Sequence, residues 1–397
     1  MSLNQTPSSE RIHISFFGKI NAGKSSLLNA LTNQDLCVVS DVRGTTTDPV
    51  QKTMELLPLG PVVLIDTPGV DDDGELGALR VEKTKQILRK TDVAVFVVDA
   101  TTGTDEVDLE WLDKLRKQGI PTILVWNKMD MVSVKPALDT DVAQVCVSVY
   151  ERTGVEELLQ RIVELAGKKN ETQKMIGDLI KPMDVVVLVV PIDESAPKGR
   201  LILPQQMAVR EILDAGGIAL VVKDTEYSRI YEELQRKPDM VITDSQVFKK
   251  VNDATPRDVA LTSFSILMAR KKGFLKMAVE GVQTLDTLQD GDLVLIAEGC
   301  THHRQCGDIG SVKLPKWISE YTGKELQFCF CSGTDYPIDV SGYKLVIHCG
   351  GCMLNENEMK HRRMQTHRQT VPFTNYGIAI AYMNCILDRS LQALQDV

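Results

Sequence analysis

The chain has 397 residues with a formal net charge of −9, and 43% of its residues are apolar and 25% charged. This length exceeds one ordinary hydrophobic core, so we expect two or three domains of a soluble globular protein. Apolar runs are too short to cross a bilayer, no signal-peptide core opens the chain, and the negative charge argues against general nucleic-acid binding, so we expect a cytoplasmic protein without membrane or nucleic-acid partners.

The first predicted elements form a phosphate-binding turn. The run IHISFF reads as a buried strand, and GKINAGKSSLLNAL after it reads as a glycine-rich turn that opens a helix. Gly18, Gly23, Lys24 and Ser25 fit the pattern GxxxxGK[ST] in the strand–loop–helix setting that this motif requires. Glycines let backbone amides face phosphate oxygens, Lys24 neutralises the β- and γ-phosphates, and Ser25 ligates Mg²⁺. Ser26 joins the same nucleotide-binding turn.

A second motif, VVLIDTPG, ends the next buried strand. It delivers Asp66 to the magnesium shell, and Gly69 offers its amide to the γ-phosphate. Val70 follows, where many GTPases place a glutamine that orients the attacking water. An apolar side chain cannot orient water, so we expect slow intrinsic hydrolysis.

Base recognition is predicted at two further strand ends. In LVWNKMD, the residues Asn127, Lys128 and Asp130 follow a buried strand. The Asp130 carboxylate can accept hydrogen bonds from N1 and the exocyclic amine of guanine, a donor pair that adenine lacks, so the expected nucleotide is GTP. In VCVSVYERTG, Ser148 stands where a backbone amide usually meets the guanine oxygen.

Residues 1–170 therefore resemble the G domain of the TrmE and Era group of GTPases, most closely in GKINAGKSS and GTTTDPV. By this resemblance Thr46 completes the magnesium site, and the catalytic set is Lys24, Thr46, Asp66 and Gly69. The same resemblance implies that Asn21 holds a K⁺ ion, so hydrolysis should be stimulated by potassium.

Within residues 172–262, three short apolar runs alternate with helical stretches. This pattern predicts a small parallel α/β domain. A dinucleotide-binding function would need a GxGxxG turn after the first strand, and PIDESAPKGRLILP stands there instead. A scaffold or association module is the favoured interpretation.

Residues 263–397 carry two cysteine motifs at predicted strand ends, and loops from neighbouring strands can face one metal or cluster. Zinc accepts cysteine and histidine together, and an iron–sulfur cluster prefers thiolates, so the residue types leave both possibilities open with zinc slightly favoured. We expect His303, His361 and His367 to be surface residues. Cys329 and Cys331 should pack inward, and the isolated Cys37, Cys146 and Cys385 should be small buried side chains. The residues of the two motifs are Cys300, His302, His303, Cys306, His348, Cys349 and Cys352.

The spacing CxH followed by HCxxC, behind a G domain and a small α/β domain, resembles the HydF family, the GTPases that mature FeFe-hydrogenase. The resemblance covers the whole chain and implies a dimerisation domain at 172–262, hence a homodimer. It also implies a 4Fe–4S cluster held by Cys300, Cys349 and Cys352 with an open or exchangeable fourth position. His302, His348 and Cys306 are the candidates for that position or for the cargo. The implied role is a scaffold and carrier that passes a diiron precursor to the apo-hydrogenase, with radical-SAM maturases as further partners.

Two other functions stay open at this point. One is a ribosome- or tRNA-associated GTPase with a structural zinc domain, and the other is a metalloenzyme that uses GTP only as a regulator. The basic run Lys360–Arg368 is either a solvated helix face or a docking surface for an acidic partner, to be tested by charge reversal at Arg362 and Arg363.

Overall fold

The computed structural model describes residues 6–32, 50–70, 77–167, 173–192, 201–234, 236–300, 308–333 and 335–394. They fall into two compact units, Met1–Glu171 and Thr172–Val397. Within these described ranges, no helix combines the length and apolarity needed to cross a membrane.

The first unit is built on a six-stranded sheet in the order β2-β3-β1-β4-β5-β6. β2 pairs antiparallel with β3, and the remaining pairs are parallel. The elements in chain order are β1 (Ile12–Phe17), α1 (Lys24–Thr32), β2 (Val50–Leu56), β3 (Gly60–Asp66), α2 (Gly77–Lys90), β4 (Val93–Asp99), α3 (Glu106–Lys117), β5 (Thr122–Asn127), β6 (Ala143–Cys146) and α4 (Val155–Gly167).

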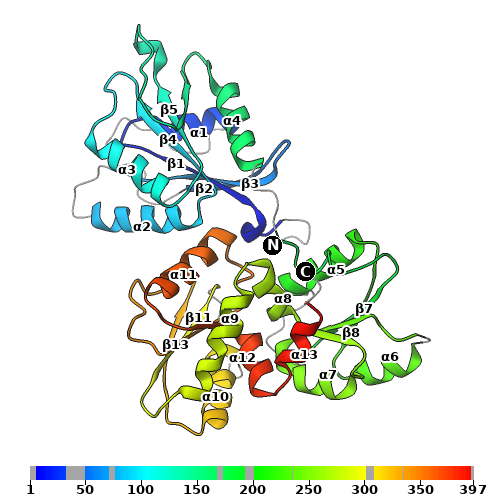
Figure 1. Cartoon of the computed structure of the whole chain (residues 1–397). Coiled ribbons are helices and arrows are strands. Elements are labelled where there is room, and N and C mark those ends of the chain that lie inside the picture. Colours follow the sequence, from blue (N-terminus) through cyan, green and yellow to red (C-terminus); the bar gives the residue numbers. More distant parts are fainter. Residues whose placement is uncertain are drawn as a thin grey trace. The chain divides into compact units, whose positions relative to one another are not determined.

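Helices cover both faces of this sheet, as Figure 1 shows. Leu27 of α1 and Leu158 of α4 belong to one hydrophobic cluster, while Ile87 of α2 and Trp111 of α3 belong to another. The central strands are buried on both faces, which explains their continuous apolar sequences. The carboxyl ends of β1, β3, β4 and β5 therefore meet at one edge, where open α/β sheets bind their ligands.

The second unit holds two four-stranded sheets, in the orders β10-β9-β7-β8 and β12-β11-β13-β14, and all their pairs are parallel. The parallel α/β architecture predicted for residues 172–262 is thus confirmed, and the α/β domain predicted for residues 263–397 is also built on a parallel sheet. The elements of the first sheet region are β7 (Val185–Val190), α5 (Leu203–Asp214), β8 (Ile218–Lys223), α6 (Tyr227–Glu233), β9 (Met240–Thr243), α7 (Phe248–Ala254) and β10 (Ala260–Ser263). Those that follow are α8 (Phe264–Lys271), α9 (Leu275–Val282), β11 (Leu293–Glu298), α10 (Leu314–Thr322), β12 (Gln327–Ser332), β13 (Leu345–His348), α11 (Glu356–Arg368), β14 (Phe373–Asn375), α12 (Tyr376–Met383) and α13 (Leu387–Gln392).

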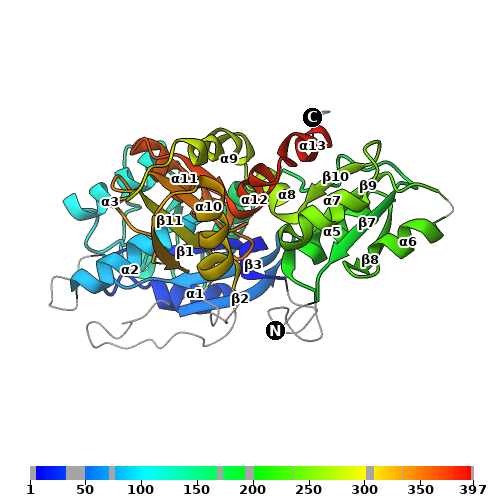
Figure 2. The same cartoon turned by 90° about the horizontal axis from the view of Figure 1, so that it is seen from below.

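One hydrophobic cluster runs through both sheets of this unit. In both views α8 and α12 lie between the two sheets (Figures 1 and 2). The α12 sequence YGIAIAYM is apolar on nearly every side, as expected of a helix covered all round. At the end of the chain, Arg389 of α13 returns to the first sheet region, where its guanidinium donates to Asn252 Oδ1 over 2.7 Å. Residues 172–262 and 263–397 are therefore packed into a single unit.

Candidate functional site

The turn after β1 has the backbone that the phosphate-binding motif requires. Gly18 has a φ of +137°, and a Cβ atom there would lie 2.2 Å from the carbonyl oxygen of Val97. Gly23 has a φ of +92°, and its Cβ would lie 2.1 Å from Nδ2 of Asn127. Lys24 is buried and its ammonium donates to the carbonyls of Gly18 over 2.9 Å and of Lys19 over 2.7 Å. The loop therefore curves around the lysine that is expected to meet the phosphates.

Two of the three residues expected around magnesium are described by the structure and lie in direct contact. The hydroxyl of Ser25 donates to Oδ2 of Asp66 over 2.5 Å, and Asp66 is fully buried at the end of β3. The third, Thr46, lies outside the described residues. Val70 N–H donates to the Gly18 carbonyl over 3.3 Å and its side chain is buried in the core, so it does not project toward a nucleotide. Gly69, one residue before it, is partly exposed.

The expected guanine-binding residues are tied to the phosphate loop and to one another. Nδ2 of Asn127 donates to the Ala22 carbonyl over 2.9 Å, which joins β5 to the turn after β1. Lys128 has a φ of +62°, and its ammonium pairs with Asp99 Oδ2 at 2.6 Å. Burial raises the pKa of Asp99, but hydrogen bonds from Lys128 and Thr101 more than offset that effect and leave the pKa below its ordinary value.

Ser148 makes two hydrogen bonds within the chain. Its amide N–H donates to the Thr153 carbonyl over 3.1 Å and is thus engaged within the chain. Its hydroxyl instead donates to Oδ1 of Asp130 over 2.6 Å. Ser148 therefore orients the carboxylate that is expected to accept from guanine, through its side chain rather than its backbone.

Cysteines from the two motifs lie side by side in the second unit. β11 and β13 are parallel neighbours with Ala297 opposite His348, so the turns that follow them start together. Sγ of Cys349 accepts from Gly299 N–H over 3.1 Å and from Gly351 N–H over 3.4 Å. A Cβ atom on Gly299 would lie 3.5 Å from Cα of Gly351. The backbones of the two cysteine turns are therefore in contact, as the sequence predicted.

The thiols of this region act on each other electrostatically. Burial, and next the neighbouring Cys349, raise the pKa of Cys300 to about 12 and that of Cys352 to about 12. Burial also raises the pKa of Cys349, against the two backbone N–H donors that favour its thiolate. In the metal-free chain, burial therefore favours the neutral thiol form of all three cysteines. Among the described residues, no three His, Cys, Asp or Glu side chains converge on the position of a single ion.

Three residues of the cysteine motifs, His302, His303 and Cys306, lie outside the described residues, as does Cys37. Cys329 and Cys331 are half-buried and pack against the core, as predicted. The prediction for Cys385 was wrong: it is exposed in a turn with a φ of +57°.

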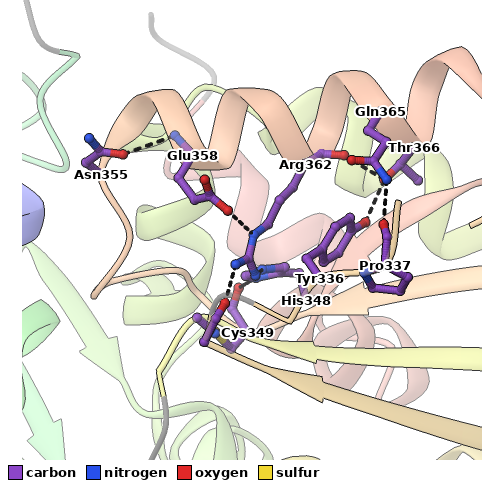
Figure 3. Close-up of polar contacts among 11 residues, drawn as sticks. Tyr336, Pro337, His348, Cys349, Asn355, Glu358, Arg362, Gln365 and Thr366 are labelled. Atoms are coloured by element: carbon purple, nitrogen blue, oxygen red, sulfur yellow. Dashed lines mark hydrogen bonds and ion pairs between the residues drawn. The ribbon is translucent and has the colours of Figure 1, made fainter. Parts of the chain in front are cut away.

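Only some side chains of the basic run Lys360–Arg368 on α11 are exposed to solvent. The prediction that Arg362 is one of the exposed charges was wrong. Its side chain is 1% exposed and pairs with Glu358 Oε1 at 3.0 Å, and it also donates to His348 Nε2 over 3.1 Å (Figure 3). Arg363 donates to the Gly273 carbonyl. The spacing of Glu358 and Arg362, four residues apart on a predicted helix, was the available signal of this pair.

Comparisons with known proteins agree with the two-unit structure. Residues 13–128 match the 50S ribosome-binding GTPase family, residues 175–273 the Hydrogen maturase F dimerization domain, and residues 276–393 the Hydrogen maturase F tetramerization domain. The chain thus carries a GTPase domain followed by two association domains, of which the sequence analysis predicted only the dimerisation domain.

The curated relatives match the first unit. The tRNA modification GTPase MnmE of Aquifex aeolicus is 33% identical over 165 residues, which covers 41% of this chain and 36% of the relative. MnmE of Thermoanaerobacter sp. (strain X514) is 36% identical over 162 residues, covering 39% of this chain and 35% of the relative. The chain therefore spans about a third of the length of the curated relatives it matches.

Among solved structures, Era of Aquifex aeolicus bound to GDP.AlF4− is 22% identical, with a TM-score of 0.37, and the match covers 55% of this chain and 97% of that one. Toc33 of Arabidopsis thaliana with Mg²⁺ and GMPPNP is 18% identical, with a TM-score of 0.33, and the match covers 40% of this chain and 86% of that one.

The adjoining matches over 175–273 and 276–393, behind a GTPase domain, agree with the CxH and HCxxC motifs. The chain belongs to the HydF family of hydrogenase maturation GTPases.

Proposed function

We propose that this chain hydrolyses GTP and acts as a scaffold that carries a 4Fe–4S cluster and delivers a diiron precursor to apo FeFe-hydrogenase. The observation that carries the proposal is the meeting of the two cysteine turns after β11 and β13, in a chain that also has a phosphate-binding loop. The proposed cluster ligands are Cys300, Cys349 and Cys352.

The chemistry of these donors fits a cluster. Three thiols are soft ligands, and N–H donors to a ligand sulfur, as at Cys349, are a usual feature around iron–sulfur clusters. With three protein ligands the cluster would supply an iron with an exchangeable position, which is what a carrier needs in order to accept and release cargo. His302 and Cys306 remain candidates for that position.

The nucleotide site is proposed to use GTP with Mg²⁺ held by Ser25 and Thr46, with Asp66 in its outer shell. Lys24 and the Gly69 amide would stabilise the charge on the γ-phosphate. Asn21 lies in the turn between β1 and α1, has a φ of +62° and is exposed to solvent. It is proposed to hold K⁺. Because Val70 is buried, hydrolysis should be slow and should depend on that cation. Equal rates in sodium and potassium would exclude this part of the proposal.

A GTPase of the Era kind that acts on RNA and carries a structural zinc domain is the competing function. It is compatible with the match of residues 13–128, whereas the matches over 175–273 and 276–393 are to Hydrogen maturase F domains and favour the carrier. Metal identity separates the two functions, because zinc in place of iron would favour the competitor.

The proposed function is tested by activation of apo FeFe-hydrogenase in a defined mixture with the radical-SAM maturases. The wild-type chain should activate it, and Cys349→Ser should fail while still binding GTP. Cys385→Ser is the matched control, because this exposed cysteine lies away from the motifs. Full activation by Cys349→Ser would refute the carrier function.

A further inference from the structure

Arg362 is a buried cation that is linked through His348 to the cysteine turn at Cys349. It lies on α11 with 1% of its side chain exposed. Its Nε donates to Oε1 of Glu358 over 3.0 Å, its Nη1 contacts Nε2 of His348 at 3.1 Å, and its Nη2 donates to the Gly333 carbonyl. The guanidinium also lies 4.9 Å from the centre of the Tyr336 ring. Such a complete set of partners holds the charge in one place.

The hydrogen bonds continue from Arg362 to the cysteine backbone. Arginine is a donor without an acceptor and stays charged, so Nε2 of His348 must accept. The proton of the neutral imidazole is then on Nδ1, which lies 2.8 Å from the carbonyl oxygen of Cys349 and donates to it. Both ring nitrogens are thereby engaged. His348 is fully buried and, with one nitrogen bonded to Arg362 and the other to the Cys349 carbonyl, has no nitrogen left for iron.

We propose that Arg362 and His348 are positioning residues for Cys349, and that the charges of Arg362 and Glu358 set the reduction potential of the cluster held there. The guanidinium orients the imidazole, and the imidazole fixes the Cys349 carbonyl. The Cys349 sulfur then stays within reach of the Gly299 and Gly351 amides. The inference on the potential rests on the proposed cluster binding, whereas the inference on positioning concerns the metal-free chain as well.

The two buried charges should act in opposite directions. Reduction adds negative charge to a cluster, and in a poorly hydrated region a nearby cation favours it while a nearby anion opposes it. Glu358 is 9% exposed, so water screens neither member of the pair well. Neutralising Arg362 should therefore lower the potential, and neutralising Glu358 should raise it. A purely structural pair would not give shifts of opposite sign.

The first experiment measures the potential by redox titration with EPR, on anaerobically reconstituted full-length chain. Arg362→Gln should shift it to more negative values, Glu358→Gln to more positive values, and the double variant should return toward the wild type. Arg362→Lys keeps the charge and should stay near the wild type. Shifts of the same sign for the two single variants, or no shift in either, would overturn the electrostatic part. If Arg362→Gln does not fold, the shift of the reduction potential in Glu358→Gln, compared with that in Arg362→Lys, still tests the electrostatic effect.

A second experiment needs no cluster and tests positioning. In the iron-free chain, the alkylation rate of Cys349 is compared with that of exposed Cys385 by mass spectrometry. Arg362→Gln should accelerate labelling of Cys349 several-fold and leave Cys385 unchanged, while His348→Gln, whose amide can accept and donate, should stay close to wild type. Unchanged Cys349 labelling in Arg362→Gln would refute positioning. If the wild type takes up no iron while this labelling result holds, the proposed function fails and the positioning inference stands.

In loaded protein, His348→Gln should also keep the EPR signal and any nitrogen hyperfine coupling of the wild type. A coupling lost only in this variant would identify His348 as an iron ligand and overturn its assignment as a positioning residue.

Discussion

The hydroxyl of Ser148 donates a 2.6 Å hydrogen bond to Oδ1 of Asp130. Ser148 is fully buried at the end of the sheet, so this contact holds the carboxylate in one orientation before any nucleotide arrives. A preoriented acceptor loses less conformational entropy on binding. The contact links two motifs that lie 18 residues apart in the chain.

Asp130→Asn should reduce GTP affinity by roughly 10- to 100-fold, the expected cost of losing a charged hydrogen-bond acceptor. An amide offers one acceptor and one donor, which suits the N1–H and C2 carbonyl of xanthine better than the two donors of guanine. Xanthosine triphosphate should therefore recover part of the lost affinity. Titration calorimetry with both nucleotides checks this, and unchanged GTP affinity would contradict the assigned role of Asp130.

Gly23→Ala should weaken nucleotide binding by about 10-fold or more, because backbone strain of about 1–3 kcal/mol adds to a collision with the Asn127 amide. Gly119→Ala is the matched control. Gly119 also has a positive φ, of +68°, but an added Cβ would meet nothing within 4 Å. Both variants carry backbone strain, and only Gly23→Ala should lose GTP affinity. Equal affinity in the two would show that the contact between Asn127 and the loop is dispensable.

The stability of the second unit should fall in acid through Asp178. A bidentate contact with buried Arg270, at 2.5 and 2.9 Å, holds the pKa of Asp178 below its ordinary value of 3.8. A carboxyl group with a lowered folded-state pKa stabilises the fold above its unfolded pKa. That stabilisation is lost as the pH falls through the lower, folded value.

Asp178→Asn should therefore cost about 1 kcal/mol near neutral pH, since the carboxylate is partly solvated, and should flatten the acid limb of the stability curve. Asp214→Asn, at an exposed i,i+4 pair with Arg210, should leave the free energy of unfolding close to that of the wild type. Urea unfolding at several pH values compares the two. An acid limb that is unchanged in Asp178→Asn would contradict the assignment.

Docking of an acidic partner on α11 should depend on the exposed basic side chains of this helix and not on buried Arg362. Lys360 and Arg368 are exposed, so their reversal to glutamate should weaken binding to an acidic partner at low salt. High salt should remove the difference. Lys316→Glu on α10 is the control, since this lysine is equally a surface residue. Binding that is indifferent to both substitutions would leave α11 as an ordinary solvated helix.

Local sequence patterns predicted most of the fold. Continuous apolar runs such as VVVLVV predicted buried parallel strands, and the turn residues after them predicted the site positions, because the strand ends of a parallel sheet share one edge. The meeting of Cys300 and Cys349 followed from the same reasoning.

The contacts that sequence reasoning missed join segments distant in the chain. The local sequence gives no clear sign that Arg362 is buried, because the helix ENEMKHRRMQTHR is mostly polar, with Met359 and Met364 as its apolar residues. Its burial depends on His348 and on the Gly333 carbonyl, which other strands bring to it. The pairing of Ser148 with Thr153 was likewise not predicted, since it forms only in the folded turn.

The most direct test of the account is the metal content of anaerobically reconstituted protein, with EPR after reduction, on wild type, Cys349→Ser and Cys385→Ser. The wild type and Cys385→Ser should bind about four irons per chain and give a reduced-cluster signal. Both should be lost in Cys349→Ser, with GTP binding retained as proof of folding. Bound zinc without iron in the wild type, after reconstitution with iron and sulfide has also failed, would contradict it.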